Sequence, residues 1–132
     1  MSADTNRAGL ARWHAYMEHP TAEGLHALLA DDAVFHSPVV HTPQAGRDKV
    51  FAYLWAAAHV FGNGSFRYLR EFVDDAGAVL EFAAEFEGIT VNGIDMIAWN
   101  EAGLISDFKV MVRPLKAVNL LHQMMGAQLQ KG

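Results

Sequence analysis

The sequence predicts an α+β domain in which a curved antiparallel sheet carries helices on its concave face. Three observations predict this class. Apolar residues recur every three or four positions across most of the first 61 residues. Between residues 65 and 113 the apolar period changes to two, and turn-forming residues separate the segments. A helical pattern returns after Pro114, and the total of 132 residues suits a single domain, residues 1–132.

Two helices are expected before the first strand. Residues 5–18 form the first, because apolar side chains recur there at helical spacing and Pro20 follows. Thr21 can cap a second, short helix, and Asp31 and Asp32 are expected to end it. The apolar side of the first helix comprises Leu10, Trp13, Tyr16 and Met17.

The segment 33–40 is expected to form a strand, AVFHSPVV. Pro38 interrupts it, which indicates an edge strand or a bend. A third helix should begin near residues 46–48 and end at the Gly-Asn-Gly sequence of residues 62–64. Its apolar residues form the clearest helical pattern in the chain, namely Val50, Phe51, Leu54, Trp55, Ala58 and Phe61.

Four strands are expected in the second half of the chain. Their ranges are 66–73, 78–87, 93–100 and 104–113, with turns between them at 74–77, 88–93 and 100–103. The second of these alternates cleanly, with apolar residues on one face and glutamates on the other. Pro114 suits the first turn of a final amphipathic helix.

Composition excludes several classes of function. A formal net charge of −5 without a basic stripe argues against nucleic-acid binding. The chain has no cysteine, hence no disulfide and no thiolate metal site. It lacks both a signal-like apolar run and the ~20 apolar residues of a membrane span, so a cytoplasmic protein without membrane contact is expected. Charged residues make up only 19%, which suggests that a partner covers some of the surface. Because only one face of each strand points at the helices, the outer sheet face can meet a second subunit, and a homodimer is expected.

Three segments and their order carry a resemblance to a known superfamily. They read LLADDAVFHSPV, GRDKVFAYL and GIDMIAWNEAGLISDFKVMVRPL. The chain resembles, over nearly its whole length, the superfamily of nuclear transport factor 2, ketosteroid isomerases and SnoaL-like proteins. The resemblance implies a cone-shaped fold. It is closest to an uncharacterised SnoaL-like subgroup with the pattern SPVV followed by VMVRPL.

The resemblance to ketosteroid isomerases also implies a site. Their general-base aspartate precedes a proline on the first strand, where this chain has Ser37. Their oxyanion-hole tyrosine lies on the first helix, where Trp13 aligns and Tyr16 lies one turn away. Their second oxyanion donor is a protonated aspartate after an isoleucine, and Asp95 matches it. One of the three positions is kept, so the resemblance implies the fold more firmly than it implies steroid isomerisation.

Asp95 is also conspicuous on its own, because it lies among apolar residues of an expected strand. Burial disfavours the charged form of a carboxyl group and raises its pKa. A carboxyl group that stays protonated can donate a hydrogen bond to a ligand oxygen. Alternatively, Asp95 is a structural residue that binds backbone amides or pairs with a basic side chain.

His36 and Ser37 are neighbours on the first strand, so they should face opposite ways. The resemblance points Ser37 inward, although its hydroxyl could instead bind nearby backbone. His36 could act as a base near neutral pH if it reached the cavity, or it could be a partly buried interface residue. The seven histidines include no HExxH motif, so neither a metal nor a cofactor is expected.

These observations support two hypotheses. In the first, the protein binds a small, mostly apolar molecule and assists isomerase, cyclase or hydrolase-type chemistry, with Asp95, Ser37 and Tyr16 as the catalytic candidates. In the second, it is a ligand-binding or protein-association module without catalysis. The sequence leaves open whether it is an enzyme. The expected ligand-binding residues are Trp13, Phe35, His36, Trp55, Phe82, Ile97, Trp99, Phe108 and Val110.

Overall fold

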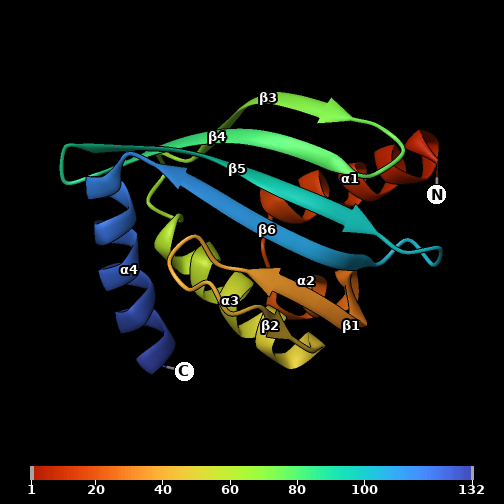
Figure 1. Ribbon diagram of the computed structural model, residues 1–132, viewed down its shortest axis with the longest axis horizontal. Helices are drawn as coiled ribbons and strands as arrows, with labels where there is room; N and C mark the ends of the chain where they lie inside the picture. Colours follow the sequence, from red (N-terminus) through yellow and green to blue (C-terminus); the bar gives the residue numbers. More distant parts are fainter. Residues whose placement is uncertain (1, 132) are drawn as a thin grey trace.

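The computed structural model describes residues 2–131 as one strongly curved sheet with helices against its concave side (Figure 1). The helices are α1 (Ala3–Glu18), α2 (Ala22–Leu28), α3 (Arg47–Val60) and α4 (Leu115–Gln130). The strands are β1 (Leu29–His36), β2 (Gln44–Ala45), β3 (Arg67–Val73), β4 (Ala78–Phe86), β5 (Ile89–Trp99) and β6 (Ile105–Arg113). The α+β class expected from the sequence is confirmed.

The strand order of the sheet is β2-β1-β6-β5-β4-β3. Strands β3 to β6 pair antiparallel with their neighbours, as hairpin-linked strands do. Strand β1 lies parallel to β6. The sheet is therefore mixed, whereas the sequence led us to expect an antiparallel sheet. A parallel pair needs a long connection, and here the chain between the two strands contains α3 and the three other long strands.

Two expected boundaries were wrong. The first strand spans residues 29–36 instead of 33–40, and Asp31 and Asp32 lie within it at exposed positions instead of ending the helix before it. Pro38 comes after the strand, because it has no N–H to donate to a neighbouring strand. The turn between β4 and β5 is also tighter than expected. Glu87 and Gly88, with φ values of 51° and 79°, make the whole reversal, so β5 begins at Ile89.

Local chemistry explains how α1 and α2 begin and how α1 packs. Ser2 accepts a hydrogen bond from the backbone N–H of Thr5, and Thr21 accepts one from Gly24, as expected for a capping residue. At Gly9, an added Cβ would lie 2.5 Å from the indole ring of Trp99. A glycine at this position therefore allows α1 to approach the sheet closely.

The inward face of the sheet forms the core with the helices. The alternation expected for β4 is confirmed, because Leu80, Phe82 and Phe86 are buried while Glu85 is exposed. One apolar cluster lies beneath α1, α2 and α3, and a second joins β4 and β5 to α4. Within residues 2–131, none of the helices combines the length and the apolar character that crossing a membrane would require.

Candidate functional site

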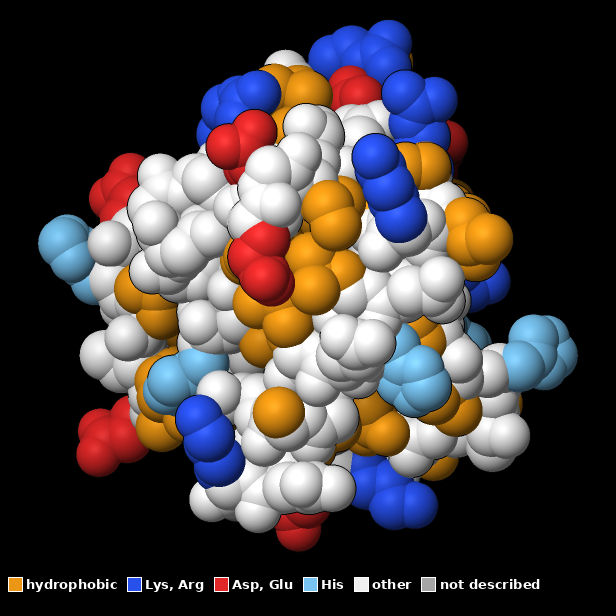
Figure 2. All heavy atoms as spheres, turned by 90° about the vertical axis from the view of Figure 1, so that its left-hand side faces the viewer, with side chains coloured by type: hydrophobic (Ala, Val, Ile, Leu, Met, Phe, Trp, Pro, Cys, Tyr) orange, Lys and Arg blue, Asp and Glu red, His pale blue; other side chains and the backbone are white. Residues whose placement is uncertain are grey.

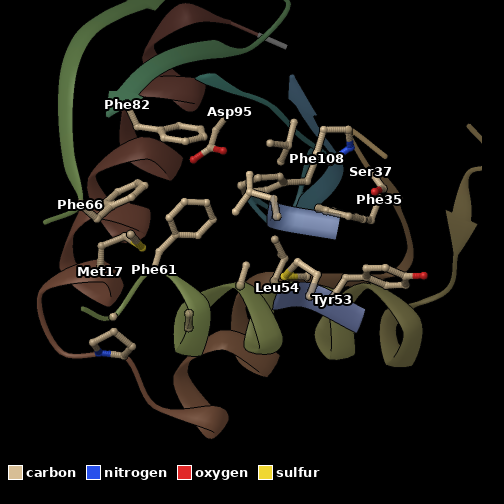
Figure 3. A pocket seen from close by; sticks show the side chains of 18 of the residues that line it. Met17, Phe35, Ser37, Tyr53, Leu54, Phe61, Phe66, Phe82, Asp95 and Phe108 are labelled. Carbon is tan, nitrogen blue, oxygen red and sulfur yellow. The ribbon is translucent and has the colours of Figure 1, made fainter. Parts of the chain in front are cut away.

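A cavity of about 500 Å³ lies between the concave side of the sheet and helices α1, α3 and α4. Its walls are mainly apolar and draw on both core clusters, and the rings of Phe61, Phe66, Phe82 and Phe108 surround much of it (Figure 3). Figure 2 views the molecule from the side where α4 lies in Figure 1, and apolar side chains gather in the middle of that face. The lining residues that carry polar side-chain atoms are Trp13, Tyr16, Ser37, Tyr53, Tyr68, Asp95 and His122.

Asp95 enters the cavity from β5, where alternate residues face the helices. Its side chain points into the space between Phe82 and Phe108 (Figure 3). Only 7% of the residue is exposed. Burial raises the pKa of Asp95 from 3.8 to about 7, and a hydrogen bond from Tyr68 opposes this rise in part. The carboxyl group can therefore gain or lose a proton near neutral pH, which suits acid–base chemistry.

Tyr68 and Trp13 connect to this carboxyl group through two hydrogen bonds. The indole Nε1–H of Trp13 donates to the hydroxyl oxygen of Tyr68 at 2.9 Å. The Tyr68 hydroxyl donates to Oδ2 of Asp95 at 2.6 Å. Burial, followed by the charge of Asp95, raises the pKa of Tyr68 well above 10, so this hydroxyl keeps its proton.

Tyr68 was missed as a site residue by sequence reasoning. The period-two pattern of residues 66–73 indicated only a strand, and a tyrosine among apolar residues resembles core. The expected turn at 74–77 would by itself place Leu69 opposite Phe82, but the register shifts between Tyr68 and Glu71, so that Tyr68 pairs with Phe82 and shares its inward face. What the pattern could not indicate is that this face also holds Asp95 within hydrogen-bonding distance.

Tyr16 lines the cavity from α1 and is 8% exposed. Its hydroxyl oxygen is buried and has no hydrogen-bond partner within residues 2–131. Burial raises the pKa of Tyr16 to about 12, so it is a neutral hydroxyl at any working pH. An unpaired buried hydroxyl costs about 1–3 kcal/mol, and a polar group brought into the cavity would remove that penalty.

Ser37 and His36 point in opposite directions, in line with strand alternation. Ser37 lines the cavity, and its Oγ accepts hydrogen bonds from the backbone N–H groups of Val39 and Val40 at 3.1 and 3.3 Å. These bonds leave the Ser37 hydroxyl hydrogen free for another acceptor. His36 lies outside the cavity, where its Nε2 is 2.8 Å from Oδ1 of Asp107.

The remaining expected ligand-binding residues fall into two groups. Five line the cavity, namely Trp13, Phe35, Phe82, Phe108 and Val110. Ile97 and Trp99 are fully buried in the core cluster beneath α1 to α3 and do not line the cavity. Trp55 also lies outside it, because its ring packs against Phe51 and His59 on α3.

Part of the cavity wall was not anticipated from the sequence. Helix α4 contributes Leu121, His122, Met125, Gly126 and Leu129, and the segment after α3 contributes Phe61, Gly62, Gly64 and Phe66. The apolar stripe of α4 predicted a packed helix, but not that part of the stripe faces a hollow. Within residues 2–131, no three His, Asp or Glu side chains are grouped closely enough to hold a metal ion.

A curved sheet whose concave side holds an apolar cavity beneath helices defines a ligand-binding domain of the nuclear transport factor 2-like class. More particularly, residues 10–108 match the model of the SnoaL-like domain, so the chain belongs to the SnoaL-like family. The resemblance stated from the sequence is thereby confirmed. No curated protein matches the chain.

Solved structures share this fold. A steroid delta-isomerase from Pseudomonas aeruginosa is 39% identical over 96% of this chain and 93% of its own, with a TM-score of 0.88. An uncharacterised protein with a cystatin-like fold from Silicibacter pomeroyi is 36% identical over 91% of this chain and 84% of its own, with a TM-score of 0.82. A protein of unknown function from Mesorhizobium loti, 20% identical over 85% of this chain and 93% of its own, has a TM-score of 0.70.

Proposed function

We propose that the protein binds a small, mostly apolar molecule with a carbonyl or hydroxyl oxygen, and that Asp95 donates a hydrogen bond to that oxygen. The observation that carries the proposal is a buried carboxyl group in the wall of an apolar cavity, with a pKa raised by burial to about 7. A volume of about 500 Å³ lies within the range of small-molecule sites.

The walls indicate the class of ligand. Within residues 2–131, no Lys or Arg lines the cavity, so a carboxylate or phosphate would lose its hydration without gaining a counter-charge. The many aromatic faces favour a flat or ring-containing molecule. The ligand is therefore a neutral ring compound, whose oxygen meets Asp95, with Tyr16 and Ser37 as further hydrogen-bonding groups.

The position of the acid supports isomerase-type chemistry. A hydrogen bond from protonated Asp95 to a ketone oxygen stabilises the negative charge that develops there when a neighbouring C–H bond gives its proton to a water molecule or hydroxide ion from the solvent. The similarity to a steroid delta-isomerase supports this type of reaction.

The experiment uses the bicyclic ketone 2-tetralone and the matching hydrocarbon tetralin. We expect wild-type protein at pH 6 to bind tetralone more tightly than tetralin, and to accelerate exchange of its α-hydrogens in D₂O. Asp95→Leu, which keeps the size of the side chain but no polar group, should remove both the preference and the exchange. Equal behaviour of wild type and Asp95→Leu would refute the role of Asp95.

A second candidate function is ligand binding without turnover. It is favoured by one observation: among the described residues that line the cavity, Asp95 provides the only carboxyl group. Tetralone binding that depends on Asp95, without any acceleration of deuterium exchange across a panel of enolisable ketones, would select this function.

We also propose that two copies associate through the outer face of the sheet. Phe72, Met96 and Met111 are 62%, 37% and 47% exposed, and the β3–β4 and β4–β5 registers place Phe72 and Met96 in one row across that face. Sedimentation equilibrium should give a dimer, and Phe72→Glu combined with Met96→Glu should give a monomer. A monomeric wild type would refute the association.

A further inference from the structure

The hydrogen bonds between Trp13, Tyr68 and Asp95 have a fixed direction. An indole N–H can only donate, so the Tyr68 oxygen is the acceptor of the bond from Trp13. The single hydrogen of the Tyr68 hydroxyl is then directed to Oδ2 of Asp95, 2.6 Å away. Reversing the second bond would leave the Tyr68 hydrogen without an acceptor in a buried place.

This direction distinguishes the two oxygens of Asp95. Oδ2 accepts the hydrogen bond from Tyr68 whether or not the carboxyl group is ionised. A proton placed on Oδ2 along this bond would point at the Tyr68 hydroxyl hydrogen, and the two hydrogens would repel each other. The acidic proton must therefore be on Oδ1. The structure gives Oδ1 no hydrogen-bond partner within residues 2–131. In Figure 3 the Asp95 carboxyl group lies at the cavity between Phe82 and Phe108.

We propose that Trp13 and Tyr68 are positioning residues that occupy Oδ2 of Asp95, hold the carboxyl group in one orientation and leave Oδ1 as the atom that meets the ligand. The part concerning the ligand rests on the proposed function. The part concerning the orientation and the protonation of Asp95 does not, because it applies to the protein without a ligand. Trp13 acts on Asp95 only through Tyr68.

Other titratable groups lie near this chain of hydrogen bonds, and the test must separate them from Asp95. The His14 ring meets the Tyr68 ring edge-on at 5.5 Å and also pairs with Glu71 on β3. Tyr16 lines the cavity from α1, and His122 lines it from α4. Because a histidine ring can gain or lose a charge, His14 or His122 would imitate Asp95 in an indirect measurement.

The first measurement needs no substitution at Trp13, Tyr68 or Asp95. The Asp95 carboxyl carbon and the three indole N–H signals are followed by NMR in ligand-free protein from pH 5 to 9. We expect the Trp13 indole to shift with the same midpoint as the Asp95 carboxyl carbon, and buried Trp99 to stay constant. His14→Gln and His122→Gln serve as controls and should leave the Trp13 midpoint unchanged. The positioning roles would be overturned if the Trp13 indole signal did not shift with the Asp95 midpoint, or if it no longer shifted with pH in His14→Gln.

The second measurement is a double-substitution cycle. Tyr68→Phe removes the hydroxyl that stabilises the Asp95 carboxylate, so the pKa of Asp95 should rise by roughly one unit or more. Trp13→Phe should raise it by less, because the Tyr68 hydroxyl becomes a weaker donor. In the Tyr68→Phe background, Trp13→Phe should have no further effect. Tyr53→Phe, in the same cavity wall, is the matched control and should leave the pKa of Asp95 unchanged.

The outcomes separate the two proposals. Equal effects of Trp13→Phe in both backgrounds, or an unchanged pKa in Tyr68→Phe, would overturn the positioning roles even if tetralone binds. Should Tyr68→Phe fail to fold, the indole titration of the wild type decides alone. If the cycle behaves as expected but tetralone binds no variant, the positioning roles stand and the proposed function falls.

Discussion

Gly93 and Phe82 lie opposite each other on β5 and β4, and a Cβ at Gly93 would lie 2.7 Å from the Phe82 ring. The same Cβ would also collide with the backbone oxygen of Met111 on β6. The absence of a side chain at Gly93 therefore allows Phe82 to lie flat against the sheet, beside Asp95 and at the wall of the cavity (Figure 3). The shape of the site depends on this glycine.

Gly93→Ala should both destabilise the protein and reduce ligand affinity. Because the backbone of β6 cannot give way easily, the added methyl group pushes Phe82 into the cavity, at a cost of about 1–3 kcal/mol. Urea unfolding and tetralone binding measure the two effects. Gly126→Ala is the matched control, since it lines the same cavity with nothing within 4 Å of its added Cβ. It should unfold no more easily than the wild type, and a loss of stability as large as that of Gly93→Ala would contradict the argument.

Asp95→Asn should stabilise the protein at high pH. Burial raises the pKa of Asp95 from 3.8 to about 7, so between these values the folded protein binds more protons than the unfolded chain. The stability of the wild type therefore falls as the pH rises from about 4 to about 7. Asparagine stays neutral, so the variant should be more stable at pH 8 by up to about 4 kcal/mol, with little difference at pH 4. Denaturant unfolding at both pH values tests this, and a difference that does not vary with pH would contradict it.

The affinity for tetralone should decrease as the pH rises through about 7. Only protonated Asp95 can donate a hydrogen bond to a ketone oxygen, so affinity should be constant below pH 6 and fall about tenfold per pH unit well above the pKa. Calorimetry between pH 5.5 and 8.5 measures it. His122→Gln removes the titratable histidine of the cavity wall and should keep the profile. Affinity that increases with pH would show that the ligand prefers the carboxylate.

Asn6→Ala should destabilise the fold without altering the pKa of Asp95. Asn6 is 1% exposed, and its Nδ2 donates to the carbonyl oxygen of Asp74 at 2.8 Å, which ties α1 to the turn after β3. The variant leaves a carbonyl group unpaired, at a cost of about 1–3 kcal/mol in the free energy of unfolding. Arg7→Ala removes only an exposed ion pair with Asp4 and should change stability by less than about 0.5 kcal/mol. Similar losses in both variants would contradict this difference.

Much of the fold and one essential part of the site were predictable from local pattern. Period and turn residues indicated the order of the major elements, and strand alternation separated Ser37 from His36. An apolar strand also singled out Asp95. Prediction failed where the pattern was ambiguous: Asp31 and Asp32 looked like the end of a helix but lie in an exposed part of β1.

The sequence by itself determined which faces of the helices and strands are buried, because burial of apolar area is encoded in spacing along one segment. Only the tertiary structure decided which buried groups meet. Trp13, Tyr68 and Asp95 come from α1, β3 and β5, separated by 55 and 27 residues. The pairing of β3 with β4 also shifts in register between Tyr68 and Glu71, and this shift determines that Tyr68 lies opposite Phe82. Spacing within a segment carries no information about distances between segments, so the hydrogen bonds that orient Asp95 appear only once the whole sheet has curved around the cavity.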